Sequence, residues 1–297
     1  MKRNEIITFA IAYKSKFQIS SRFYLDYSQM RLNKHAFSYH LNKKKDQKLI
    51  LFLHGFLGDR HEFNPIIASL NQDYSYLTID IPGHGKTQVL GGEEYYNMSN
   101  IAAGIINLLD ELHINKCGLF GYSMGGRLAL YLAIYYPERF SKLILESASP
   151  GLESQMERNE RIKKDTGIAR KLERINTQED FTNFLVTWYS QAIFGNIKNH
   201  PGFEQLISNR LRNNPQELAK SLRFMGTGCQ PSLWEKLRQN QIPTLLLAGE
   251  DDPKFIGINQ KMQNICRFCQ LTIIPKAAHN THLENTDEFM QAIISFV

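Results

Sequence analysis

Three residues far apart in the chain have the types and the order of a nucleophile, a carboxylate and a base. Ser123 lies within Gly121-Tyr122-Ser123-Met124-Gly125, Asp252 follows Gly249-Glu250, and His279 comes last. A histidine that accepts the serine proton makes the hydroxyl a strong nucleophile or base, and a carboxylate holds that histidine in the required tautomer. We therefore expect proton-transfer chemistry at Ser123. Asp251 and Glu250 are the alternatives for the acid, and the spacing after Gly249 favours Asp252.

The segment around Ser123 has the composition of a sharp turn between a strand and a helix. An apolar run at 116–120 precedes it, and a helical pattern at 127–133 follows it. This order predicts a nucleophile elbow, in which small neighbours tolerate a strained turn and the helix N-terminus favours negative charge. We expect the backbone N–H groups of Met124 and Phe56 to form the oxyanion hole.

The elements that would position these residues alternate along the chain. Apolar runs predict strands at 35–41, 48–53, 76–80, 116–120, 142–146, 243–248 and 270–274, and helical patterns cover 59–70, 100–112, 127–133 and 287–297. Alternation of this kind predicts a mostly parallel sheet with helices on both faces. Serine, aspartate and histidine then follow strand ends in the order of the α/β-hydrolase fold. We expect Lys43-Lys44-Lys45 to form a hairpin loop between the first two strands.

The alternation stops at Pro150-Gly151 and resumes near residue 238. The segment 151–237 is polar and helical, which predicts a lid inserted over the carboxyl ends of the strands. Residues 31–150 and 238–297 form the expected core. Residues 1–30 are an extension of unassigned role: an extra strand, an arm, or sequence ahead of a start at Met30.

Composition narrows the class of partner. The 297 residues carry a net charge of +6, which favours anionic ligands. No nucleic-acid motif, phosphate-binding glycine loop or apolar run of about 20 residues is present, so we expect no nucleic acid, no cofactor and no membrane insertion. The run at 6–13 is too short for a signal peptide. The lone Cys266-x-x-Cys269 lacks a second ligand pair, so we expect no metal and reduced thiols in the cytoplasm.

Several stretches, most of them outside the elbow, are more typical of one protein family than of the fold as a whole. They resemble one branch of the α/β-hydrolase superfamily, the 2-succinyl-6-hydroxy-2,4-cyclohexadiene-1-carboxylate (SHCHC) synthases of menaquinone and phylloquinone biosynthesis, over roughly 48–290. The similar stretches include LHGFLGD (53–59), DIPGHG (80–85), GYSMGGRLAL (121–130), RNERIKKD (158–165), NRLRNN (209–214), SLRFMGTGCQPSLW (221–234), GEDDPKF (249–255) and AAHNTH (277–282).

The resemblance implies a lyase that uses the Ser-His-Asp triad as a base. Its reaction eliminates pyruvate from 2-succinyl-5-enolpyruvyl-6-hydroxy-3-cyclohexene-1-carboxylate to give SHCHC. The small anionic substrate carries three carboxylates, which arginine binds well through two parallel hydrogen bonds. Positions that match the family's substrate-binding residues are Arg127, Arg161, Arg210, Tyr122 and Trp188.

Three questions stay open at this point. Arg158 is an alternative to Arg161, and Arg212 to Arg210. The alternative function is a carboxylesterase or carbon–carbon bond hydrolase that uses the same triad. The sequence carries no signal for an oligomeric state.

Overall fold

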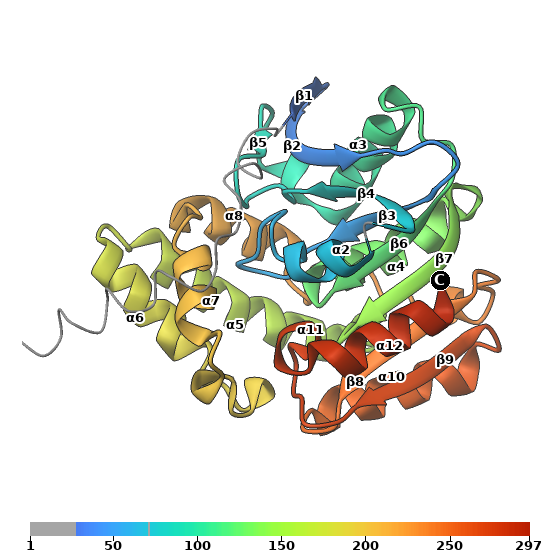
Figure 1. Cartoon of the computed structure of the whole chain (residues 1–297). Helices are drawn as coiled ribbons and strands as arrows, with labels where there is room; N and C mark the ends of the chain where they lie inside the picture. The colour runs from blue at the N-terminus through green and yellow to red at the C-terminus, as the bar shows by residue number, and fades with distance from the viewer. Residues whose placement is uncertain (1–27, 71) are drawn as a thin grey trace, which may run out of the picture.

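The computed structural model describes residues 28–70 and 72–297, which fold around a nine-stranded sheet (Figure 1). Six strands run parallel to one another, and three more pair antiparallel at one edge of this set. The predicted mostly parallel sheet is therefore confirmed. In spatial order the strands are β1 (Ser28–Leu32), β2 (His35–Asn42), β4 (Tyr74–Ile79), β3 (Lys48–Leu53), β6 (Cys117–Tyr122), β7 (Phe140–Glu146), β8 (Thr244–Gly249) and β9 (Cys269–Ile274), with β5 (Gln88–Val89) on β2.

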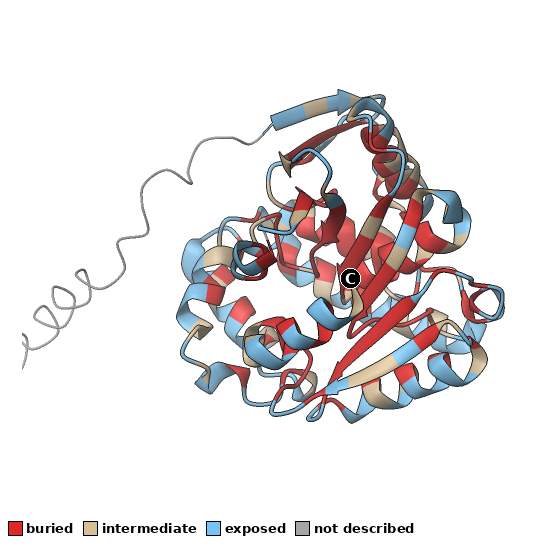
Figure 2. Ribbon diagram, turned by 45° about the vertical axis from the view of Figure 1, so that its right-hand side comes forward, coloured by how far each residue is buried: buried red, intermediate tan, exposed pale blue. Residues whose placement is uncertain are grey.

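The central strands are mostly buried and apolar because helices cover both of their faces. All six residues of β8 are buried, and so are five of the six in β3. A strand with one face in water would instead alternate polar and apolar residues. Figure 2 shows this arrangement, with buried strands inside and helices whose outer sides are exposed.

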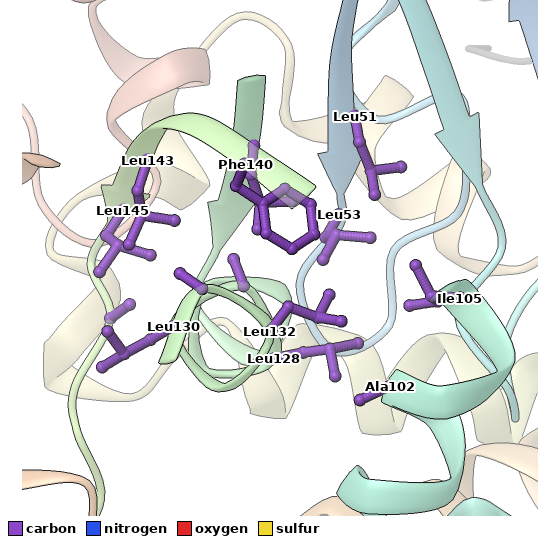
Figure 3. Packing of buried hydrophobic residues seen from close by; sticks show 14 of the residues in the cluster. Leu51, Leu53, Ala102, Ile105, Leu128, Leu130, Leu132, Phe140, Leu143 and Leu145 are labelled. Atoms are coloured by element: carbon purple, nitrogen blue, oxygen red, sulfur yellow. The ribbon is translucent and has the colours of Figure 1, made fainter. Parts of the chain in front are cut away.

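One face of the sheet packs against α3 (Met98–Glu111), α4 (Met124–Tyr135) and α10 (Pro253–Ile265). Figure 3 shows Leu128 and Leu132 of α4 beneath Leu53 of β3, with Ile105 of α3 beside them. These leucines are completely buried, and each contributes roughly 1.5–3 kcal/mol of hydrophobic free energy on folding. The helix that follows Ser123 is therefore fixed at the centre of the core.

The opposite face packs against α2 (Asn64–Leu70) and α12 (Thr286–Phe296). Aromatic side chains pack against one another within this layer, with ring centroids of Phe63 and Phe120 4.8 Å apart and those of Phe120 and Phe289 5.9 Å apart. The short helix α11 (Thr281–Glu284) leads from the His279 loop into α12.

The segment between β7 and β8 forms a helical layer at the carboxyl ends of the strands (Figure 1). It has its own apolar cluster, into which Leu57 of the core inserts. Trp234 and Leu237 lie near the end of the expected insert. They pack instead in the core cluster on the sheet face that α3, α4 and α10 cover. The helices of this segment are α5 (Gln155–Glu173), α6 (Gln178–Trp188), η4 (Ala192–Phe194), η5 (Ile197–Asn199), α7 (Phe203–Arg210), α8 (Pro215–Met225) and α9 (Trp234–Leu237); η2 (Glu93–Tyr96) and η3 (Pro137–Arg139) lie in the core.

Two local predictions were wrong. The helix expected from residue 59 begins at Asn64, because Pro65 fits only the first turn of a helix and the Asp59 carboxylate accepts the His61 N–H in a preceding turn. Lys43-Lys44-Lys45 is not a hairpin loop, because β4 lies between β2 and β3.

The amino-terminal boundary also differs from the sequence-based one. Strand β1 spans Ser28–Leu32 and crosses the boundary expected at residue 30. The expectations for residues 1–27 fall outside the described residues. In the part of the chain that is described, no helix is both long and apolar enough to cross a bilayer.

Candidate active site

Ser123 lies at a strained turn between β6 and α4. Its φ of 49° and ψ of −107° fall outside the ordinary helix and strand regions. A Cβ on Gly121 would lie 2.4 Å from the Gly125 carbonyl oxygen, and one on Gly125 would lie 2.2 Å from the Leu53 oxygen. Only glycine fits at these two positions, so the elbow geometry requires the small residues of the motif.

The structure brings Ser123, His279 and Asp252 together, in the arrangement predicted from their order. Ser123 Oγ lies 2.9 Å from His279 Nε2, and His279 Nδ1 lies 3.0 Å from Asp252 Oδ2. Asp252 and His279 are 1% and 4% exposed. With Nδ1 donating to the carboxylate, Nε2 of a neutral His279 can accept the Ser123 proton.

Asp252, rather than either of its acidic neighbours, contacts His279. Its other oxygen, Oδ1, accepts the Phe255 N–H at 3.2 Å and thereby caps α10. Glu250 accepts the Lys276 N–H instead, and Asp251 is exposed. The helix cap therefore fixes which carboxylate oxygen faces the imidazole.

Ser123 and His279 open into a cavity of about 600 Å³ between the core and the lid. Phe56, Met124 and Tyr122 line its core side, and Trp188 lines the lid side. The rings of Trp188 and Phe56 have centroids 5.3 Å apart. Both residues expected to supply oxyanion N–H groups thus border the cavity that holds the serine.

Arg127 brings a buried positive charge to this cavity. Its Nη1 donates to the Met225 carbonyl oxygen at 2.9 Å and to Gln230 Oε1 at 3.1 Å. Burial, and then the nearby charge of Arg161, lower the pKa of Arg127 to about 10. Its hydrogen-bond partners are neutral, and the nearby charge of Asp165 offsets only part of the lowering, so the buried guanidinium is suited to bind an anion.

Arg161 and Lys254 also line the cavity, whereas Arg158 is not among its lining residues. Arg161 Nε is 2.8 Å from Asp165 Oδ1, a contact that uses one edge of the guanidinium. Burial and the charge of Arg161 lower the pKa of Lys254. Arg158 Nε donates to the Gly228 carbonyl oxygen, so of the two candidates it is Arg161 that lies at the site.

Arg210 lies in α7 and is not among the lining residues of this cavity. Its Nη2 is paired with Glu62 Oε1, and its Nε donates to the Tyr189 hydroxyl at 2.9 Å. Arg210 is 3% exposed, whereas its alternative, Arg212, is on the surface. In this structure the Arg210 guanidinium is bound by Glu62 and Tyr189. The substrate-binding role expected for Arg210 stays a prediction.

Known proteins support the fold and the family. A family model described as alpha/beta hydrolase fold matches residues 48–286. The 2-succinyl-6-hydroxy-2,4-cyclohexadiene-1-carboxylate synthase of Serratia proteamaculans (strain 568) is 32% identical over 255 residues, which cover 85% of this chain and 94% of that protein. This chain belongs to the SHCHC synthase family. The resemblance found in the sequence is therefore confirmed.

This SHCHC synthase family member is also similar to two solved structures and to a plant protein. The structure of MenH from S. aureus has a TM-score of 0.80 and 36% identity, and the match covers 89% of this chain and 98% of that one. The chloroplastic protein PHYLLO of Arabidopsis thaliana is 28% identical over 289 residues, which are 91% of this chain and 17% of that protein. A thermophilic esterase from Thermogutta terrifontis, at 23% identity and a TM-score of 0.76, shows the fold alone.

Sequence reasoning missed several residues that surround the site of this family member. The ring centroids of Phe255 and Phe194 lie 4.8 Å and 5.6 Å from that of His279. Phe255 follows Asp252 by one helical turn, so its place beside the triad could have been predicted from the sequence. Phe194 comes from the lid, and only the tertiary structure places it there.

A buried ion pair beneath the elbow was also missed. Glu146 is completely buried, and one of its oxygens lies 2.8 Å from His282 Nδ1. Burial lowers the pKa of His282, but Glu146, and then Glu62, outweigh that effect and raise the pKa above 6.5. The Glu146 carbonyl oxygen accepts the Ser123 N–H at 2.8 Å, so this pair supports the strand that carries the serine turn.

Proposed function

We propose that this protein is a lyase that eliminates pyruvate from 2-succinyl-5-enolpyruvyl-6-hydroxy-3-cyclohexene-1-carboxylate to give SHCHC. The observation that carries the proposal is the pair of arginines, Arg127 and Arg161, in the same cavity as Ser123. A substrate with three carboxylates matches these cations, whereas a simple ester would favour an apolar wall. The two acidic residues of the lining are engaged elsewhere, Glu153 with Lys261 and Glu157 with the Ser154 cap. The relatives that are named SHCHC synthases support the same activity.

The reaction begins with transfer of the Ser123 proton to His279 Nε2. The serine oxygen then takes the proton from ring carbon 2, which is acidic because it lies next to the carbonyl of the succinyl group. The electron pair forms the double bond between carbons 2 and 3, the existing one shifts to carbons 4 and 5, and the bond from carbon 5 to the enolpyruvyl oxygen breaks. The leaving group is the enolate of pyruvate, which takes the proton held by His279 and becomes pyruvate. Ser123 keeps the proton taken from carbon 2, so serine and histidine return to their starting states.

Negative charge that develops on the succinyl carbonyl oxygen needs donors in place before the reaction. The backbone N–H groups of Phe56 and Met124 have this role in the proposal. Asp252 stabilises the imidazolium of His279 at the same stage. The Trp188 and Tyr122 rings supply apolar walls for the substrate ring.

The test follows pyruvate release from the purified protein through coupled lactate dehydrogenase. We expect Ser123→Ala to remove nearly all activity. Arg127→Met and Arg161→Met should raise KM, because each removes a cation from the cavity. Arg158→Met is the matched control, since Arg158 shares helix α5 with Arg161 but is not among the residues that line the cavity. Rapid hydrolysis of p-nitrophenyl esters without pyruvate release would contradict the proposal and favour an esterase.

We also infer that the protein acts in a reducing compartment, the cytoplasm. All four of its cysteines are free thiols, including Cys266 and Cys269, which are three positions apart. Paired cysteines would instead be expected in an oxidising compartment.

A further inference from the structure

The loop that carries Phe56 is held on both sides of this residue. On one side, the Gly55 N–H donates to Glu62 Oε2 at 3.2 Å. On the other side, the Leu57 carbonyl oxygen accepts from Asn213 Nδ2 at 2.8 Å. The peptide unit that carries the Phe56 N–H is held through its Gly55 carbonyl oxygen, which lies 2.7 Å from His54 Nδ1 and accepts the Gly58 N–H at 3.0 Å. Glu62 holds the peptide unit just before it and Asn213 a unit further along, so these contacts together restrict where that donor points.

A third bond fixes the same loop. The Leu57 N–H donates to His84 Nε2 at 3.2 Å. Burial, and then the charge of His54, hold the pKa of His84 well below 6.5, so the ring stays neutral and Nε2 can accept.

Two of these contacts depend on one short segment of the lid. Arg210 at the end of α7 is paired with Glu62, and Asn213 lies three residues later. Asn213 also accepts the Gly85 N–H at 2.7 Å, which joins the loop after β3 to the loop after β4. The segment 210–213 therefore fastens the lid to both loops.

The Arg210–Glu62 pair is buried, with side chains 4% and 2% exposed. Burial lowers the pKa of Arg210, but Glu62 and Tyr189 outweigh it and raise the pKa above its usual value, so the guanidinium stays charged. Loss of Arg210 would leave buried Glu62 with the more distant His282, whose Nε2 lies 3.9 Å from Glu62 Oε1, as its cationic neighbour. Without Arg210 the Glu62 side chain can change its rotamer, which weakens its hold on the Gly55 N–H.

We propose that Arg210 is a positioning residue that acts through Glu62 to hold the Phe56 N–H in the oxyanion hole, and that it does not bind a substrate carboxylate. This inference rests on the proposed use of Ser123 and the oxyanion hole. It differs from the role expected for Arg210 from the family resemblance. A misplaced oxyanion donor lowers kcat, whereas a lost carboxylate partner raises KM.

The first test compares Arg210→Met, Glu62→Gln and the double variant in pyruvate release. We expect Arg210→Met to lower kcat by about 30- to 100-fold, the range for a weakened oxyanion donor, with KM changed by less than about 3-fold. Because Arg210 acts through Glu62, the double variant should be no slower than the slower single variant. The matched control is Arg212→Met, two residues away and exposed, which should behave as wild type.

The second test uses diisopropyl fluorophosphate, a neutral reagent without a carboxylate. Its phosphoryl oxygen occupies the oxyanion hole while Ser123 displaces fluoride. We expect Arg210→Met to slow this inactivation by about the same factor as kcat, and the surface control Arg212→Met to leave it within about 3-fold of wild type. Circular dichroism and Tm verify folding, and Arg210→Lys, which keeps the charge but loses the paired geometry, replaces any variant that does not fold.

The outcomes separate the two proposals. If Arg210→Met raises KM and leaves inactivation by the fluorophosphate unchanged, Arg210 binds substrate and this inference is wrong. If the wild type releases no pyruvate but reacts with the fluorophosphate, the proposed function fails, and the second test still decides the role of Arg210. Failure of wild-type Ser123 to react with either compound would overturn both.

Discussion

Replacing Asp252 with asparagine should nearly abolish turnover while the protein stays folded. Asp252 uses both oxygens: Oδ2 lies 3.0 Å from His279 Nδ1, and Oδ1 accepts the Phe255 N–H at 3.2 Å. In Asp252→Asn the amide oxygen must stay on the Phe255 N–H, so the NH₂ group faces His279 Nδ1. The imidazole then carries its proton on Nε2 and cannot accept the proton of Ser123.

The size of the effect follows from these contacts. Turning the amide around would place NH₂ against the buried Phe255 N–H, which costs about 2–3 kcal/mol, or a factor of ~30–150. Loss of the carboxylate charge beside the imidazolium removes a charge-assisted hydrogen bond worth about 1.5–3 kcal/mol, a further factor of ~10–150. We therefore expect kcat to fall by roughly 3 × 10²- to 2 × 10⁴-fold.

The assay is pyruvate release coupled to lactate dehydrogenase, with single-turnover measurements to separate chemistry from product release. Asp251→Asn is the matched control, because it makes the same change at the exposed neighbouring position and should retain wild-type kcat. Unfolding in urea should show Asp252→Asn to be folded under assay conditions. A decrease of less than 10-fold would refute the reasoning, since the tautomer of His279 would then not depend on Asp252.

Gly125→Ala should lower the free energy of unfolding by about 3 kcal/mol, because its Cβ would meet the Leu53 carbonyl oxygen at 2.2 Å. In Gly167→Ala the new Cβ would meet open space within helix α5, so this change should instead raise the free energy of unfolding by about 0.5–1 kcal/mol. Urea unfolding of both variants measures the two effects. The raised pKa of His282 beside Glu146 gives a pH dependence. Its stabilisation is complete below pH 6.5, the ordinary value, and disappears as pH rises through the raised pKa. The unfolding free energy of the wild type should therefore fall over that window more than that of His282→Gln, and equal slopes would contradict this.

Much of the fold could be predicted because its signals are local. A run such as that of β8 can be apolar throughout only if both faces are covered, and the polar helical stretch after Pro150 cannot continue a buried sheet. The errors arose where pairing is decided over long distances. Lys43-Lys44-Lys45 joins consecutive strands, but β4 takes the position between them.

The sequence by itself determined the elbow and the order of Ser123, Asp252 and His279, because strand ends and glycine turns are encoded within a few residues and parallel strands end at one edge of the sheet. Only the tertiary structure decided where the cations point. Arg161 faces the cavity and Arg158 does not, and Arg210 is turned away to Glu62, which lies 148 positions earlier in the chain. The direction of a long side chain depends on which buried charge lies nearby, and such partners come from distant segments.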